Sequence, residues 1–116
     1  LRTEYLERFP ASLRLNMVPF ENGDLLRIPT EREVFGENRY GEEEPDTVEQ
    51  FEAMKKRRNR MAFDGSNGET QAYWLQNKRV WSATYFCGVD YSGNANGNNA
   101  SNSLGVRPLY RIRNYR

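Results

Sequence analysis

The chain has 116 residues, 37% of them hydrophobic and 13% aromatic, and a formal net charge of +1. This size predicts one domain with one modest core, and the small charge gives no field that would recruit nucleic acid or an anionic membrane. One cysteine, Cys87, and no histidine exclude an internal disulfide, a Cys- or His-based metal site and Ser-His or Cys-His catalysis. No stretch has the apolar length of a membrane span or a signal sequence. Because the chain begins at Leu1 rather than Met, we expect it to be the C-terminal part of a longer protein.

The first elements are predicted to be short strands. Residues 12–19 alternate Leu13, Leu15 and Met17 with polar neighbours, which is the period of a half-buried strand. Gly23-Asp24 indicates a turn, and residues 25–28 then predict a second short strand.

A short helix is predicted next, over residues 30–35. Thr30 is placed as its N-cap, and Glu33 three residues later completes a capping box. Val34 and Phe35 should face inward, and Gly36 can end the helix.

A second, longer helix is predicted over residues 47–60. Asp46 and Glu49 repeat the start signal, and Val48, Phe51 and Met54 mark a buried stripe at helical spacing. Its basic end, MKKRRNR, has the composition of a nucleic-acid patch. Base at a helix C-terminus also complements the helix dipole, and that interpretation is favoured, so we expect no nucleic-acid partner.

Strands are predicted at residues 71–75, 80–89 and 105–113, with turns at residues 90–93 and within the asparagine-rich segment. Two helices followed by several strands predict an α+β domain with an antiparallel sheet. The residues expected to be buried are Val48, Phe51, Met54, Trp74, Val106 and Ile112.

The segment from residue 80 to residue 110 is the candidate ligand-binding region. Five asparagines stand within residues 94–102, between β-prone apolar stretches. Small polar side chains build no core but can form a contact surface, so we expect a recognition face on a rigid frame. The predicted exposed, ligand-binding residues are Tyr85, Cys87, Asp90, Tyr91, Asn94, Asn96, Asn98, Asn99 and Ser101. The predicted structural frame is Trp74, Trp81, Gly105 and Arg107.

Two motifs resemble a known fold family. RIPTERE, from Arg27 to Glu33, and the Gly-Val-Arg-Pro strand at residues 105–108 resemble segments of C-type-lectin-like domains of the formylglycine-generating-enzyme branch. More closely, IPTEREVFG, the Tyr73-Trp74 pair and the ending NNASNSLGVRP resemble a domain of unknown function found in gut bacteria and their phages. The resemblance covers residues 12–112. It implies a C-type-lectin-like fold with two helices packed on twisted antiparallel strands and no disulfides.

The same fold branch includes the variable proteins of diversity-generating retroelements. There, miscopied adenines turn asparagine codons into codons for other residues, but never for Glu, Lys, Gln, Met or Trp. All 23 residues of these five types lie outside residues 82–109 of this chain. A turn-rich segment avoids long side chains as well, so a non-varying relative stays an open alternative.

The resemblance implies a binding module rather than an enzyme. We expect a ligand-binding display domain of a phage tail or bacterial cell surface, engaging an unknown protein or glycan; the alternative is a structural or assembly domain that packs against other domains or subunits of its parent protein. No cofactor and no metal site are predicted. Glu42–Glu44 is interpreted as a capping feature rather than a calcium site, and a single cysteine without histidine does not fit the copper chemistry of the sulfatase-activating enzymes. Trp74 is assigned to the core rather than to sugar stacking, and Cys87 to packing or codon variation rather than nucleophilic chemistry.

Overall fold

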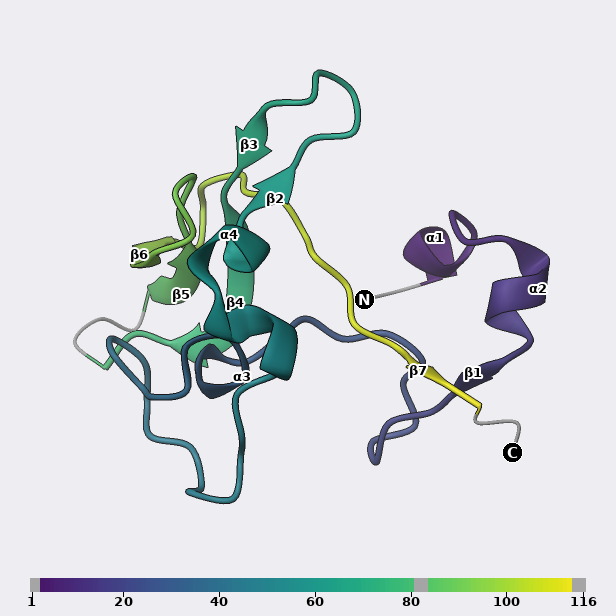
Figure 1. The fold of residues 1–116 in the computed structure, drawn as a ribbon, viewed down its shortest axis with the longest axis horizontal. Helices are drawn as coiled ribbons and strands as arrows, with labels where there is room; N and C mark the ends of the chain where they lie inside the picture. The colour runs from purple at the N-terminus through teal and green to yellow at the C-terminus, as the bar shows by residue number, and fades with distance from the viewer. Residues whose placement is uncertain (1–2, 81–83, 114–116) are drawn as a thin grey trace. The chain divides into compact units, whose positions relative to one another are not determined.

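Two compact units make up the structure, a computed structural model that describes residues 3–80 and 84–113 (Figure 1). Leu1–Ile28 with Pro108–Arg116 form the first unit, and Pro29–Arg107 forms the second. Short helices combine with antiparallel strand pairs, so the predicted α+β class is confirmed. The single cysteine is free, so the chain has no disulfide. The longest helix in the described part of the chain has five residues, and none there could cross a bilayer.

The first unit begins with helices rather than with a strand. Its elements up to residue 18 are α1 (Thr3–Leu6), α2 (Ala11–Arg14) and β1 (Met17–Val18). The predicted strand over residues 12–19 is therefore wrong in its first half. Pro10 has φ −57°, and its carbonyl accepts the backbone N–H of Leu13. This bond starts a helical turn over residues that the alternation of apolar and polar side chains predicts as strand.

Strand β1 pairs antiparallel with β7 (Arg111–Ile112) near the end of the chain, with Met17 opposite Ile112. The predicted strand over residues 105–113 is reduced to this pair and to isolated bridges at Gly105 and Leu109. The predicted burial of Ile112 is wrong, because its side chain is 53% exposed. Its partner Met17 is buried, so the short pair covers β1 and leaves β7 exposed.

The turn predicted at Gly23-Asp24 is confirmed. Gly23 has φ +90°, and its N–H donates to the carbonyl of Phe20 at 2.8 Å. The strand predicted after it, over residues 25–28, is wrong in extent, since only Arg27 makes a bridge, to Leu109. One bridging residue is too short a segment to form a strand pair.

In the second unit, helix α3 (Glu31–Phe35) confirms the capping-box prediction. The Thr30 side chain accepts the backbone N–H of Glu33 at 3.3 Å, and the Glu33 carboxylate accepts the N–H of Thr30 at 2.9 Å. Val34 and Phe35 are buried as expected, and Gly36 ends the helix with φ +79°.

The long helix predicted over residues 47–60 is wrong. The segment holds only a 3₁₀ turn, η1 (Glu52–Lys55), and one turn of α-helix, α4 (Arg57–Arg60). Ahead of η1, Val48 N–H bonds to the Pro45 carbonyl in a local turn, and other backbone groups bond to α3: Arg32 Nε donates to the Val48 carbonyl at 3.0 Å, and Phe51 N–H donates to the Glu33 carbonyl at 2.9 Å. A 14-residue helix is marginal by itself, so these tertiary bonds decide the conformation.

A three-stranded antiparallel sheet in the order β4-β5-β6 forms the centre of the second unit. Its strands are β4 (Tyr73–Lys78), β5 (Tyr85–Val89) and β6 (Ala95–Asn99). A separate hairpin pairs β2 (Ala62–Phe63) with β3 (Thr70–Gln71). The predicted strand over residues 80–89 begins only at Tyr85, and its residues 81–83 lie outside the described part. Strand β6 was not predicted, because its asparagines and glycine have low β propensity.

The hydrophobic core lies between α3, η1 and one face of this sheet. It consists of Val34, Phe35, Met54, Tyr73, Leu75, Cys87 and Val89. Of the residues predicted to be buried, Met54 is buried, whereas Val48, Phe51, Trp74 and Val106 are half-buried. Strand β4 alternates, and Tyr73 and Leu75 occupy its core side, so Trp74 faces the other way.

Candidate ligand-binding face

The hairpin of β5 and β6 carries most of the predicted ligand-binding residues, but its alternation divides them between two faces. Paired residues share a face of an antiparallel sheet, and Tyr85 pairs with Asn99, Cys87 with Gly97 and Phe86 with Asn98. Because Cys87 is in the core, the Tyr85–Asn99 pair lies on the core side of the sheet. Asn96 and Asn98 therefore lie on the opposite, outer side.

Cys87 is not part of an exposed face, and this prediction is wrong. Its side chain is fully buried at 0% exposure, at an inward position of the central strand. Burial, followed by the charge and hydrogen bonding of Glu31, raises the pKa of the thiol to about 12. A buried thiol that stays protonated is neither a ligand contact nor a nucleophile.

The outer side combines amides with aromatic rings. Trp74 and Phe86 meet edge to face at a centroid distance of 6.4 Å, and both are half-buried. Asn96 is exposed, and its Oδ1 accepts the N–H of Gly97 at 2.8 Å. Asn98 is half-buried and bonds to the backbone N–H of Asn99 and to the Asn102 side chain.

The loop between β5 and β6 holds its shape through Asp90. One oxygen of this carboxylate, Oδ1, accepts the N–H groups of Ser92 and Asn94, each at 2.9 Å. The Asp90 N–H in turn donates to the Asn94 carbonyl at 2.9 Å. Asp90 is therefore a positioning residue of the loop. Tyr91, 59% exposed, and Asn94, also exposed, project from it.

Helix α4 fastens the same loop from the other side. Arg57 Nη1 donates to the Ser92 carbonyl at 2.8 Å, and Arg60 Nε donates to the Gly93 carbonyl at 3.0 Å. Gly93 has φ +81°, and a Cβ there would lie 2.6 Å from the Arg57 carbonyl oxygen. Only glycine fits this approach. The interpretation of these arginines as partners of a helix dipole is therefore incomplete, and the signal in the sequence for their role in the loop is Gly93 in the Asp90 turn.

The far end of β6 closes in a second turn. Asn99 Oδ1 accepts both the N–H and the hydroxyl of Ser101 at 3.0 Å. Ser101 is exposed and Asn99 is half-buried. The side chains of Asn99 and Ser101 bond within the turn itself, whereas those of Tyr91 and Asn94, at the opposite end of the hairpin, are exposed.

Two of the predicted frame residues contact the sheet directly. Gly105 forms a bridge to Tyr73, and a Cβ on it would lie 3.0 Å from the Ala72 carbonyl oxygen. Arg107 Nη1 donates to the Asn59 carbonyl at 3.2 Å and to the Tyr73 hydroxyl at 3.1 Å. Of the other two predicted frame residues, Trp74 is half-buried in β4, and Trp81 lies outside the described residues.

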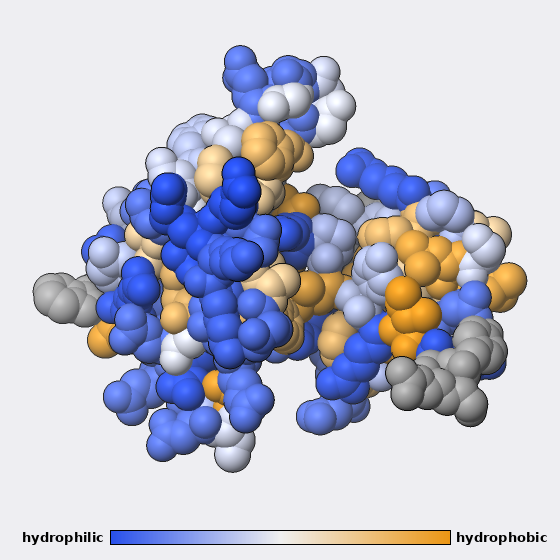
Figure 2. Space-filling model, in the orientation of Figure 1, coloured by the Kyte–Doolittle hydropathy of each residue, from blue (hydrophilic) through white to orange (hydrophobic). Residues whose placement is uncertain are grey.

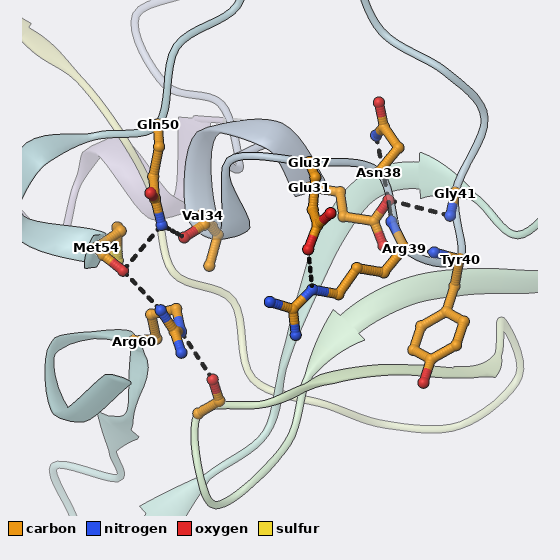
Figure 3. A network of polar contacts seen from close by, with 11 residues as sticks. Glu31, Val34, Glu37, Asn38, Arg39, Tyr40, Gly41, Gln50, Met54 and Arg60 are labelled. Carbon is orange, nitrogen blue, oxygen red and sulfur yellow. Dashed lines mark hydrogen bonds and ion pairs between the residues drawn. The ribbon is translucent and has the colours of Figure 1, made fainter. Parts of the chain in front are cut away.

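A buried carboxylate joins α3 to the loop that follows it (Figure 3). Glu31 is 0% exposed and accepts the backbone N–H groups of Arg39, Tyr40 and Gly41, each at 3.0 Å, and the Asn38 side chain at 3.1 Å. These residues form the Glu31 node. Four donors on one carboxylate satisfy its buried oxygens, so the node is a structural element of the unit.

Glu44, from the acidic run at residues 42–44, extends this network. Its Oε2 accepts the N–H of Arg32 at 3.0 Å and the side chains of Asn38 and Asn77 at 2.8 and 2.9 Å. Glu44 thus bonds an N–H at the start of α3, and not at the start of the helix predicted over residues 47–60, for which the acidic run is interpreted as a capping feature. Within residues 3–80 and 84–113, no three His, Cys, Asp or Glu side chains come together in a way that could hold a metal ion.

Comparison of the chain with models of protein families, with curated proteins and with solved structures finds no match. The geometry of the hairpin is therefore the basis for a candidate site. Exposed hydrogen-bonding and aromatic side chains lie there on a backbone that Asp90, Arg57 and Arg60 hold in place.

Proposed function

We propose that this chain is a non-enzymatic ligand-binding display domain whose contact surface is centred on Tyr91, Asn94 and Asn96. These three residues are called the tip surface below. The observation that carries the proposal is that the three side chains are exposed and that the loop carrying Tyr91 and Asn94 is shaped by other groups. Exposed tyrosine supplies stiff contact area and asparagine supplies adaptable hydrogen bonds, which is the chemistry of antibody contact loops.

The tip surface tolerates change because it is separate from the core. The Asp90 carboxylate, the Arg57 and Arg60 guanidinium groups and the close packing of Gly93 fix the backbone beneath it. Exposed substitutions away from such contacts alter stability by about 0.5 kcal/mol or less, whereas truncating a buried side chain costs about 2–5 kcal/mol. A surface with this property suits a domain whose ligand specificity changes.

We further assign the domain to the C-type-lectin-like fold and to the variable proteins of diversity-generating retroelements, on a phage tail or bacterial cell surface. The support is the sequence resemblance around α3 and at residues 105–108, and the absence of Glu, Lys, Gln, Met and Trp from residues 82–109. The buried position of Cys87 restricts variation to outward positions of the hairpin. The ligand is a protein or a glycan on a target surface.

A second candidate is an assembly domain of the same kind of parent protein, without sequence variation. The observation that favours it is that several asparagine side chains bond to their own backbone. Asn96 bonds Gly97, and Asn99 bonds Ser101. Asparagines with such local bonds stabilise turns whether or not a ligand is present.

The two candidates differ in what the hairpin tolerates. We would randomise the three tip positions in one displayed library and Tyr85, Cys87 and Asn99 in a matched library. The display function predicts that most tip variants fold and that some bind a model protein target, while most members of the second library unfold. Loss of folding in most tip variants would contradict it and favour the assembly domain. At the genomic level, the retroelement assignment predicts a reverse-transcriptase gene nearby and an imperfect repeat of the codons for residues 80–110.

A further inference from the structure

At the opposite end of the hairpin from the Asp90 loop, the guanidinium group of one arginine contacts two tyrosine rings. The Arg79 guanidinium carbon is 5.2 Å from the Tyr40 ring centroid and 6.0 Å from the Tyr85 ring centroid. Stacking on ring faces holds a guanidinium plane in one orientation while leaving its N–H edge free.

The backbone fixes all three residues of this stack. Arg79 N–H donates to the Tyr85 carbonyl at 2.9 Å, and Val80 N–H donates to the Tyr40 carbonyl at 2.9 Å. The arginine side chain lies across Gly97, where a Cβ would be 3.2 Å from Arg79 Cδ. The missing side chain of Gly97 therefore leaves the room that the arginine occupies.

Arg79 differs from the other half-buried arginines of the second unit in what its guanidinium donates to. Arg32, Arg60 and Arg107 each bond backbone carbonyls of neighbouring segments. Within residues 3–80 and 84–113, the Arg79 guanidinium donates no hydrogen bond and forms no ion pair. An arginine with a purely structural role normally donates its N–H groups to protein acceptors. The N–H groups of the Arg79 guanidinium have no such acceptor and can therefore bind a ligand.

The surroundings of Arg79 have the composition of a protein–protein contact. Tyr40 is 39% exposed, Val80 is 62% exposed, and Tyr85 is half-buried beside them. Arginine and tyrosine are enriched among the residues that dominate binding energy in such interfaces. We name Tyr40, Arg79, Val80 and Tyr85 the Arg79 patch.

We propose that the Arg79 patch binds an aspartate or glutamate carboxylate of a protein partner, with the guanidinium as a two-pronged donor. A planar carboxylate matches the guanidinium fork and carries one negative charge. Lys78 pairs with Phe86 and therefore lies on the outer face of the sheet, opposite to Tyr85. One guanidinium fork without Lys78 beside it suits a carboxylate better than a phosphate. The inference deepens the proposed binding function and rests on it.

The test begins with a random peptide library selected against the full chain immobilised in its native state. We expect selected peptides to be enriched in Asp or Glu at one position. The same selection on the Arg79→Gln variant should lose this enrichment. The Arg58→Gln variant is the matched control, since it removes the same charge from an exposed position on α4, and its selection should keep the enrichment.

A double-mutant cycle then tests the contact itself. Changing the acidic residue of a selected peptide to its amide should weaken binding to the wild-type chain about tenfold, and Arg79→Gln should cause a similar loss. The two changes together should cost little more than either alone. Arg79→Lys keeps the charge without the fork, so it should also bind several times more weakly, and urea unfolding checks that each variant is folded.

Three outcomes would overturn the proposal: no acidic enrichment on the wild-type chain, equal enrichment on Arg79→Gln, or undiminished binding by Arg79→Lys. Binding of uronic-acid oligosaccharides that depends on Arg79, without binding of acidic peptides, would overturn the protein partner in favour of an acidic glycan. Tip-surface variants run in parallel separate this proposal from the display function. If they alone change the selected peptides, the Arg79 patch is not the contact and the display function stands; if neither set of variants changes the peptides, both proposals fail.

Discussion

The Glu31 node and the tip surface use similar side chains for opposite purposes. In the node, a fully buried carboxylate accepts four donors, three of them backbone N–H groups of one loop (Figure 3). In the loop of the tip surface, the Asp90 carboxylate also accepts backbone N–H groups, but its neighbours Tyr91 and Asn94 face solvent. The surface over α4 beside the tip is strongly hydrophilic (Figure 2).

The difference shows that burial, rather than the number of hydrogen bonds, separates a structural polar group from an available one. Removing Glu31 would leave the buried N–H of Gly41 and the part-buried N–H groups of Arg39 and Tyr40 without their acceptor, and an unpaired buried group costs about 1–3 kcal/mol. Removing the Tyr91 or Asn94 side chain exposes no such group, because the loop backbone is satisfied by Asp90, Arg57 and Arg60. The predictions below test this contrast.

The largest contrast concerns the thiol beside the Glu31 node. With its pKa raised from 9.0 to about 12 and no exposed surface, Cys87 should hold roughly a thousandfold less thiolate at pH 8 than the unfolded chain. We expect labelling by a thiol reagent to be slower than in urea by at least that factor. The rates would be followed by mass spectrometry. Rapid labelling of the native protein would mean that the sheet opens readily at β5.

Glu31→Ala should give the largest loss of stability. Because the N–H groups of Arg39, Tyr40 and Gly41 lose their acceptor, we expect the free energy of unfolding to fall by at least about 3 kcal/mol. The measurement is urea unfolding followed by circular dichroism. Glu37→Ala is the control, since Glu37 pairs with Arg39 at an exposed position and such pairs contribute about 0–1 kcal/mol. Equal losses for the two variants would show that the node does not differ from the surface.

Gly93→Ala should destabilise the loop beneath the tip surface by about 3 kcal/mol. The substitution combines a positive φ, which costs about 1–2 kcal/mol for an L-residue, with a 2.6 Å approach to the Arg57 carbonyl. Gly68→Ala separates the two effects, because Gly68 has φ +73° but no atom within 4 Å of the added Cβ. Thermal unfolding should therefore place Gly68→Ala about midway between Gly93→Ala and the wild type.

Acid should weaken the network around Glu44. Burial raises the pKa of this carboxyl, but hydrogen bonds from the Thr30 side chain, the Arg32 N–H and the Asn38 and Asn77 side chains outweigh it, so the pKa is lowered below 4.5. The unfolded chain then takes up the proton first, so this stabilisation is present above pH 4.5 and is lost as pH falls through the folded-state pKa. Urea unfolding across this range should show a shallower pH dependence for Glu44→Gln than for Glu43→Gln, whose carboxyl is exposed.

The smallest effect is expected at the tip surface itself. Tyr91→Ser and Asn94→Ser should each change the free energy of unfolding by no more than about 0.5 kcal/mol. The control Asn99→Ala removes the acceptor of the Ser101 N–H and hydroxyl and should cost about 1 kcal/mol. If the tip variants lose as much stability as the control, their side chains are structural.

Local chemistry determined those parts of the fold that the sequence predicts correctly. Thr30 and Glu33 define the start of α3 and Gly36 defines its end, all within one short segment, so no distant residue is needed. The turns at Gly23 and Gly93 are local in the same way, because each needs the positive φ angle of its own glycine. The alternation of β4 and β5 is also a local property, and applied strictly it would have assigned Cys87 to the core with Val89.

Tertiary structure decided the rest, because it satisfies backbone groups through residues far apart in the sequence. Residues 47–60 lack a long helix since α3 supplies partners to their backbone. Asparagines with low β propensity form β6 because β5 offers them a full antiparallel register. The sequence alone determined that polar side chains concentrate near residues 90–102. Which of them face solvent was set by the pairing of β6 with β5 and by the bonds of Arg57 and Arg60 to the loop.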